Sequence, residues 1–164
     1  MKNILKFMTI LIALSISLNA GVKVDKKLKA QMMSAWKAEV KASKTITKGI
    51  TDKELIKWMN KDKEFILVDV REPKEVAAGR ILAINFMAIP RGVVTAMIGK
   101  KVKLRPNQTI VFYCKAGARS SFVAQEVEKY FGFKHVYYLK GGIMGWIKNG
   151  HEISNLMGEF KKSK

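Results

Sequence analysis

Short continuous runs of apolar residues alternate along the chain with stretches in which apolar residues recur at helical spacing. A continuous apolar run of about four to eight residues is typical of a strand that is buried on both faces. The chain contains three such runs, over Phe65–Val70, Thr109–Tyr113 and His135–Leu139. Each of them is followed or preceded by a segment with helical periodicity, so the pattern indicates strands and helices in alternation.

Helices are predicted over Asp52–Met59, Arg71–Gly79, Val93–Val102, Ser120–Phe131 and Ile143–Lys148. Thr51 and Glu54 form a capping box at the start of the first of these helices, because each side chain can accept a backbone hydrogen bond from the other residue. Gly132 is a suitable end for the fourth. Buried strands that alternate with helices are typical of an α/β fold. We therefore predict a central, mostly parallel sheet of about five strands with helices on both faces.

The first twenty residues predict an export signal. Lys2 and Lys6 accompany an apolar run over Phe7–Leu18, and a plausible cleavage site follows between Ala20 and Gly21. The run is shorter than the roughly 20 apolar residues that a membrane-spanning helix needs. A cleaved signal predicts a periplasmic protein that begins near Gly21. The alternative is an uncleaved membrane anchor.

A lysine-rich segment follows the predicted signal and has apolar residues at helical spacing. It predicts an amphipathic helix from about Lys26 to Ala42. The favoured interpretation is a solvated basic face on a helix that packs on the domain, and the alternative is peripheral contact with a membrane or an acidic protein. The expected organisation is a signal over 1–20, a basic helix over 21–45, a domain over 46–152 and a C-terminal tail over 153–164.

The net charge and the cysteine count reduce the number of plausible partners and cofactors. The formal net charge is +18, which favours anionic partners. Nucleic acid is not expected among them, because no nucleic-acid motif is present and the predicted export signal argues against it. Cys114 is the single cysteine, and His135 and His151 are the only histidines, so a zinc site of the Cys/His type is not credible. We expect neither a metal nor a cofactor.

Cys114 has the surroundings of a reactive cysteine. It directly follows a predicted strand and precedes a predicted helix, whose N-terminal partial positive charge stabilises a thiolate. Lys115 and Arg119 add positive charge, and Gly117 lets the loop fold tightly enough for its N–H groups to converge on an anion. A buried, inert cysteine is the alternative.

The chain resembles the rhodanese family over roughly residues 46–152. The matching pieces are Val68-Asp69-Val70-Arg71-Glu72-Pro73 with Glu75 and Gly79, Ala83-Ile84-Asn85, Ile89-Pro90-Arg91-Gly92, Cys114-Lys115-Ala116-Gly117-Ala118-Arg119-Ser120, and Leu139-Lys140-Gly141-Gly142-Ile143-Met144-Gly145-Trp146. Their order and spacing make the resemblance specific. One departure is Arg80, which stands where the family usually has histidine.

The resemblance implies a sulfurtransferase in which Cys114 carries sulfur as a persulfide. The donor would be a small anion such as thiosulfate or polysulfide, and the acceptor a thiophile such as cyanide, a thiol or sulfite. The expected substrate-binding residues are those of the active loop, Lys115, Ala116, Gly117, Ala118, Arg119 and Ser120.

Four residues outside the loop are expected to support it. Asp69 and Arg71 could hold the neighbouring loops, although a purely structural ion pair is the favoured interpretation. Gly141 and Gly142 are expected to allow a close backbone approach beside the active loop.

The spacing of Cys114 and Arg119 separates sulfur transfer from phosphate chemistry. Four residues lie between them, whereas cysteine-dependent phosphatases of related architecture have five and so form a larger loop. A phosphatase or arsenate reductase therefore ranks below a sulfurtransferase. A sulfur carrier or redox-sensing module that acts without turnover remains open, because it would need the same persulfide.

Overall fold

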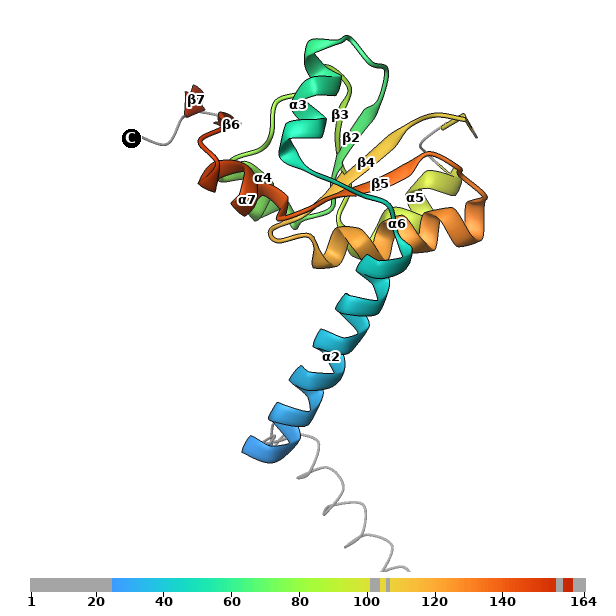
Figure 1. The fold of residues 1–164 in the computed structure, drawn as a ribbon, viewed down its shortest axis with the longest axis vertical. Coiled ribbons are helices and arrows are strands. Elements are labelled where there is room, and N and C mark those ends of the chain that lie inside the picture. The colour runs from blue at the N-terminus through green and yellow to red at the C-terminus, as the bar shows by residue number, and fades with distance from the viewer. Residues whose placement is uncertain (1–24, 101–103, 106, 156–157, 161–164) are drawn as a thin grey trace, which may run out of the picture. The chain divides into compact units, whose positions relative to one another are not determined.

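A five-stranded parallel sheet forms the centre of the fold (Figure 1). The computed structural model describes residues 25–100, 104–105, 107–155 and 158–160. The strands stand in the order β1-β5-β4-β2-β3, and all neighbours run parallel. Their bounds are β1 Gly49–Ile50, β2 Ile66–Asp69, β3 Phe86–Ala88, β4 Ile110–Tyr113 and β5 Val136–Leu139. The predicted fold class is confirmed.

Helices cover both faces of this sheet. The buried side chains of α3 (Asp52–Asn60) and α7 (Gly142–Lys148) belong to one apolar cluster, and those of α5 (Val94–Lys100) and α6 (Ala118–Phe131) belong to the other. Trp146 is in the core, as predicted. The short helix α4 (Pro73–Ala77) and the 3-10 turn Arg91–Val93 follow β2 and β3 at the carboxyl edge of the sheet.

Local sequence signals account for the ends of several helices. The Thr51 hydroxyl accepts a hydrogen bond from the Glu54 amide at 3.2 Å, and the Glu54 carboxylate accepts one from the Thr51 amide at 2.7 Å. The predicted capping box is therefore present. Gly132 ends α6 with φ of +68°, a left-handed conformation that glycine adopts readily.

The strands β1 and β3 were not identified individually from the sequence. They have two and three residues, which is too short to show a strand pattern. Each pairs with only one neighbour, β1 with β5 and β3 with β2, so they form the two edges of the sheet. They complete the predicted number of strands.

The segment before the sheet is a long helix, α2, which runs over Lys26–Ile46 and so ends four residues beyond the predicted end at Ala42. The chain divides into two compact units, residues 1–37 and 38–164. Within the second unit, the Thr47 hydroxyl donates to the carbonyl oxygens of Ser43 at 2.7 Å and Ser121 at 3.4 Å. The second of these bonds connects the chain just after α2 to the start of α6.

The structure describes part of the C-terminal region but not the first 24 residues. The predicted signal over residues 1–20 lies outside the described residues. None of the described helices has the length and hydropathy to cross a membrane. The predicted C-terminal tail includes two short strands, β6 (Ile153–Asn155) and β7 (Gly158–Phe160), which pair with each other in antiparallel orientation.

Candidate active site

Cys114 lies at the carboxyl end of the central strand β4, the edge at which parallel sheets bind ligands. Its side chain is 1% exposed. The chain turns through Lys115 and Ala116, both exposed, and reaches Gly117, whose φ of +91° belongs to the left-handed region. Helix α6 begins at the next residue. This turn places the sulfur atom at the N-terminus of a helix of 14 residues.

The Cys114 sulfur atom receives hydrogen bonds from its own loop. The Gly117 amide donates to Sγ at 3.2 Å, and the Ser120 hydroxyl lies 3.6 Å from it. The Gly117 amide points at the position where negative charge resides when the thiol ionises or carries a second sulfur, and the Ser120 hydroxyl, which also lies 3.3 Å from the Gly117 carbonyl oxygen, can donate to that charge once it is present. Together with the N-terminal partial charge of α6, they stabilise a sulfur anion.

A second helix N-terminus fixes the other side of the active loop. The amides of Ile143 and Met144, in the first turn of α7, donate to the carbonyl oxygens of Cys114 at 2.9 Å and Lys115 at 3.0 Å. These bonds require a close approach at Gly142, which has φ of +55°. A β-carbon there would collide with the Cys114 carbonyl oxygen. Gly141, at φ of +77°, completes the turn from β5 into α7.

Arg119 is engaged by a carboxylate. Its two terminal nitrogens donate to the two carboxylate oxygens of Glu75, on α4, at 2.7 Å each. The hydrogen bond to Glu75 raises the pKa of Arg119, and a smaller electrostatic interaction with Cys114 acts in the same direction. The same bidentate pair lowers the pKa of Glu75 to about 2. The expected positive charge beside Cys114 is thus largely balanced, and the pair connects α4 to the active loop.

Asp69 and Arg71 form a buried ion pair at the end of β2. The Arg71 guanidinium donates to both carboxylate oxygens of Asp69, at 2.9 Å and 2.6 Å, and to the carbonyl oxygens of Glu75 and Gly79. Burial alone would lower the pKa of Arg71, but the hydrogen bonds and charge of Asp69 outweigh it and raise the pKa. Burial also raises the pKa of the neighbouring Tyr113. This cluster shapes α4 and thereby positions Glu75.

The acid sensitivity of the Glu75–Arg119 pair is a first testable consequence. Because the folded-state pKa of Glu75 lies near 2 and its ordinary value is 4.5, the pair contributes its full stability above about pH 4.5 and loses it as the pH falls toward 2. We expect Glu75→Gln to be less stable than wild type at pH 7, with the difference shrinking steadily below pH 4.5. Urea unfolding at several pH values measures it.

Glu126→Gln is the matched control for that experiment. Glu126 pairs with Arg91 at 3.4 Å on the surface, where side-chain exposure is 36% and 42%, so this ion pair should contribute little. A stability difference between Glu75→Gln and wild type that did not change between pH 7 and pH 3 would contradict the assigned pKa of Glu75.

The sequence-predicted site residues converge on one edge of the sheet. Cys114, Gly117 and Ser120 are buried together around the sulfur atom, whereas Ala118 and Arg119 are half-buried at the start of α6. The role of Glu75 was not identified from its position alone, since it lies 44 residues from Arg119. Its only signal was its place in the matched segment that begins at Val68.

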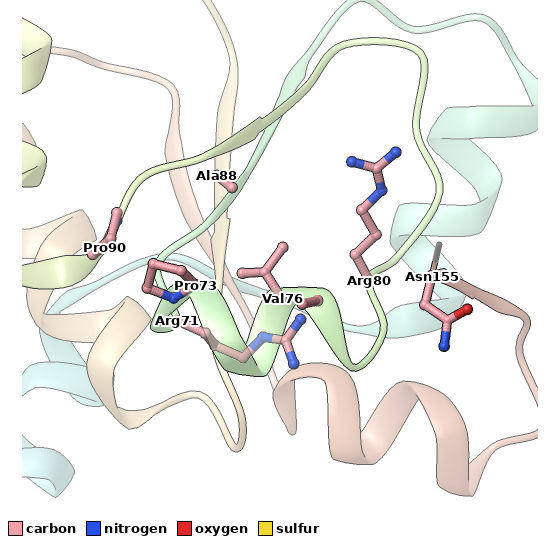
Figure 2. A pocket seen from close by; sticks show the side chains of 8 residues that line it. Arg71, Pro73, Val76, Arg80, Ala88, Pro90 and Asn155 are labelled. Carbon is pink, nitrogen blue, oxygen red and sulfur yellow. The ribbon is translucent and has the colours of Figure 1, made fainter. Parts of the chain in front are cut away.

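Two cavities lie on either side of α4. One, of about 270 Å³, borders the active loop and is lined by Arg71, Glu75, Ala78, Gly79, Lys115, Ile143, Met144, Ile147 and Ile153. The other, of about 400 Å³, lies beside the carboxyl end of β3 (Figure 2). Figure 2 shows Val76 on α4 between Pro90 and Arg80. The Arg80 guanidinium stacks over Phe86 at 4.7 Å, so the residue that departs from the family pattern has a packing contact. The first cavity is the one adjacent to Lys115.

Comparison with known proteins identifies the family. The family model described as "Rhodanese-like domain" matches residues 51–149. A protein named "Probable adenylyltransferase/sulfurtransferase MoeZ", from Mycobacterium tuberculosis, is 35% identical over 99 residues. That match covers 60% of this chain but only 24% of the relative, so the chain corresponds to about a quarter of that protein.

Two smaller relatives match over most of their length. A protein named "Sulfurtransferase", from Allochromatium vinosum, is 30% identical over 94 residues, which cover 55% of this chain and 78% of the relative. The solution structure of a polysulfide-sulfur transferase homodimer from Wolinella succinogenes matches with a TM-score of 0.65 and 28% identity. It covers 77% of this chain and 91% of the solved chain.

Proposed function

We propose that this chain, which belongs to the rhodanese-like domain family, is a sulfurtransferase that carries sulfur as a persulfide on Cys114. The observation that supports this most is the tight loop in which the Gly117 amide and the Ser120 hydroxyl approach the Cys114 sulfur atom. The loop leaves the sulfur at a helix N-terminus, where an anion is favoured. The relatives named as sulfur transferases support the same reaction class.

The first half-reaction loads the cysteine. The Cys114 thiolate attacks the sulfane sulfur of an anionic donor, and a new S–S bond forms as the old one breaks. With thiosulfate, sulfite leaves with the bonding electron pair; with polysulfide, a shorter polysulfide leaves. No separate base is needed once the thiolate has formed, and the loop N–H groups stabilise the resulting persulfide anion.

The second half-reaction unloads it. A thiophilic acceptor such as cyanide attacks the outer sulfur, and the electron pair of the S–S bond returns to Cys114 as the thiolate. The enzyme alternates between the free thiolate and the persulfide, and the first product leaves before the acceptor reacts. Ping-pong kinetics are therefore expected. In the periplasm, the compartment that we propose for the mature protein, the acceptor would be a thiol, sulfite or a partner protein.

The state of Arg119 argues against phosphate hydrolysis. A phosphate ester needs several donors around its oxygens, and a guanidinium is the strongest side chain for this purpose. Here each terminal nitrogen of Arg119 donates one hydrogen bond to Glu75, which balances its charge and fixes its orientation, and the loop is one residue shorter than the phosphatase loop. The loop is therefore better suited to a single sulfur atom than to a tetrahedral oxyanion.

Steady-state kinetics with two substrates tests the proposal. We expect the full chain to convert thiosulfate and cyanide to sulfite and thiocyanate, with parallel lines in double-reciprocal plots. Hydrolysis of a generic aryl phosphate, without sulfur transfer from thiosulfate or polysulfide, would place a phosphatase above a sulfurtransferase. Loading of Cys114 without turnover by any small acceptor would indicate a sulfur carrier.

A further inference from the structure

Lys44, in the last turn of α2, lies beside the active loop. Its Cε is 3.8 Å from the position that a β-carbon on Gly117 would occupy, and Gly117 is the residue whose amide donates to the Cys114 sulfur. The hydrogen bond from the Thr47 hydroxyl to the Ser121 carbonyl oxygen, at 3.4 Å, holds this part of the chain against α6. Lys44 belongs to the same compact unit as the sheet.

The residue Lys44 is partly buried, and its ammonium makes no ion pair or hydrogen bond with any described residue. Two other cations are paired: Lys48 lies 3.8 Å from Glu128, and Arg119 is held by Glu75. Lys44 therefore contributes uncompensated positive charge at the active loop.

Lys115 adds a second uncompensated charge at the same place. It is exposed, directly follows Cys114 and lines the cavity of about 270 Å³ beside the loop. It also forms no ion pair with a described carboxylate. The active loop thus has two uncompensated cations, Lys115 within it and Lys44 beside Gly117, whereas the charge of Arg119 is offset by Glu75. Their combined field attracts an anion toward Cys114.

We infer that Lys44 is a specificity-determining residue that, with Lys115, favours sulfur donors carrying negative charge over neutral ones. The inference rests on the proposed function for its substrate class. Lys44 lies outside residues 51–149, so this cation comes from the segment before the matched domain. A doubly charged donor such as thiosulfate gains more from the field than a neutral reagent, and the departing sulfite is stabilised in the same way.

Alkylation of Cys114 measures this field without relying on sulfur transfer. Iodoacetate carries one negative charge and iodoacetamide carries none, while both attack the same thiolate. We expect Lys44→Met to lower the ratio of the iodoacetate rate to the iodoacetamide rate about three- to tenfold, the size of one Coulomb interaction over several ångströms near a protein surface. Lys44→Arg should keep the ratio close to that of wild type.

Lys41→Met is the matched control. Lys41 lies on the same helix, is exposed, and its substitution removes the same formal charge. Its ratio should stay nearer the wild-type value at moderate ionic strength, because Lys41 lies about one turn further back along α2 and its exposed charge is screened by water and salt. An equal fall in Lys41→Met and Lys44→Met, or no fall in either, would overturn the inference.

Persulfide formation then separates the inference from the proposed function. For thiosulfate, which carries two negative charges, Lys44→Met should slow persulfide formation about ten- to a hundredfold and weaken its dependence on salt. If the wild-type protein never forms a persulfide but the alkylation ratio still falls in Lys44→Met, Lys44 favours anionic reagents as inferred, and the proposed sulfur transfer is refuted. If the wild type loads and Lys44→Met loads equally fast, the role of Lys44 is refuted while the proposed function remains.

Discussion

Replacing Gly142 with alanine is expected to reduce sulfur transfer at least about a hundredfold and to destabilise the fold by about 2–4 kcal/mol. The new β-carbon would collide with the Cys114 carbonyl oxygen and lie 2.7 Å from that of Lys115. Both are backbone atoms and cannot rotate away. The active loop or α7 must move, and either movement breaks the hydrogen bonds from the Ile143 and Met144 amides. Denaturant unfolding and persulfide formation measure the two effects.

Gly132→Ala is the control that isolates the collision. Gly132 also has a left-handed backbone, with φ of +68°, but a β-carbon there would meet nothing within 4 Å. The free energy of unfolding of Gly132→Ala should therefore fall only by the conformational strain, about 1 kcal/mol, and its activity should be retained. Similar losses of activity in the two variants would show that the contact between Gly142 and the active loop has no special role.

Cys114→Ser is expected to abolish sulfur transfer and to leave the fold intact. A serine hydroxyl occupies nearly the same space and can accept the Gly117 hydrogen bond, but it cannot form a persulfide. Stability should therefore change by no more than about 1 kcal/mol, since the partner groups remain satisfied. Production of thiocyanate from thiosulfate and cyanide, with a denaturant curve on the same sample, checks both parts.

Residual activity in Cys114→Ser would locate the chemistry elsewhere. Cys114 is the only cysteine in the chain, so no second thiol of this protein can replace it. If Cys114→Ser loses both activity and cooperative unfolding, alkylation of the wild-type protein tests the catalytic role of Cys114 instead. A single iodoacetamide adduct at Cys114 of the wild-type protein should block sulfur transfer completely.

The elements that carry strong local signals were predictable. The three long apolar runs became β2, β4 and β5, because strands that are covered on both faces need no alternation of polar residues. The position of Cys114 at a strand end followed from the same pattern. The edge strands β1 and β3 could not be found in this way, since two or three residues carry no period.

The charged contacts around Cys114 join residues that are far apart in the sequence, so the local sequence pattern could not predict them. Arg119 was expected to act on the donor, but the fold brings Glu75 to it from α4, and the two residues are 44 positions apart. Lys44 was one lysine among many in a basic helix, and only the packing of that helix end against the active loop distinguishes it. Both interactions are set by tertiary structure rather than by neighbouring residues.

Mass spectrometry of the intact full chain after brief exposure to thiosulfate or polysulfide tests the central claim most directly. We expect a mass gain of one sulfur atom, located on Cys114 by peptide mapping, removed by cyanide and absent from Cys114→Ser. An unchanged mass with both donors, while Cys114 remains reactive toward iodoacetamide, would contradict the proposal that this cysteine carries sulfur.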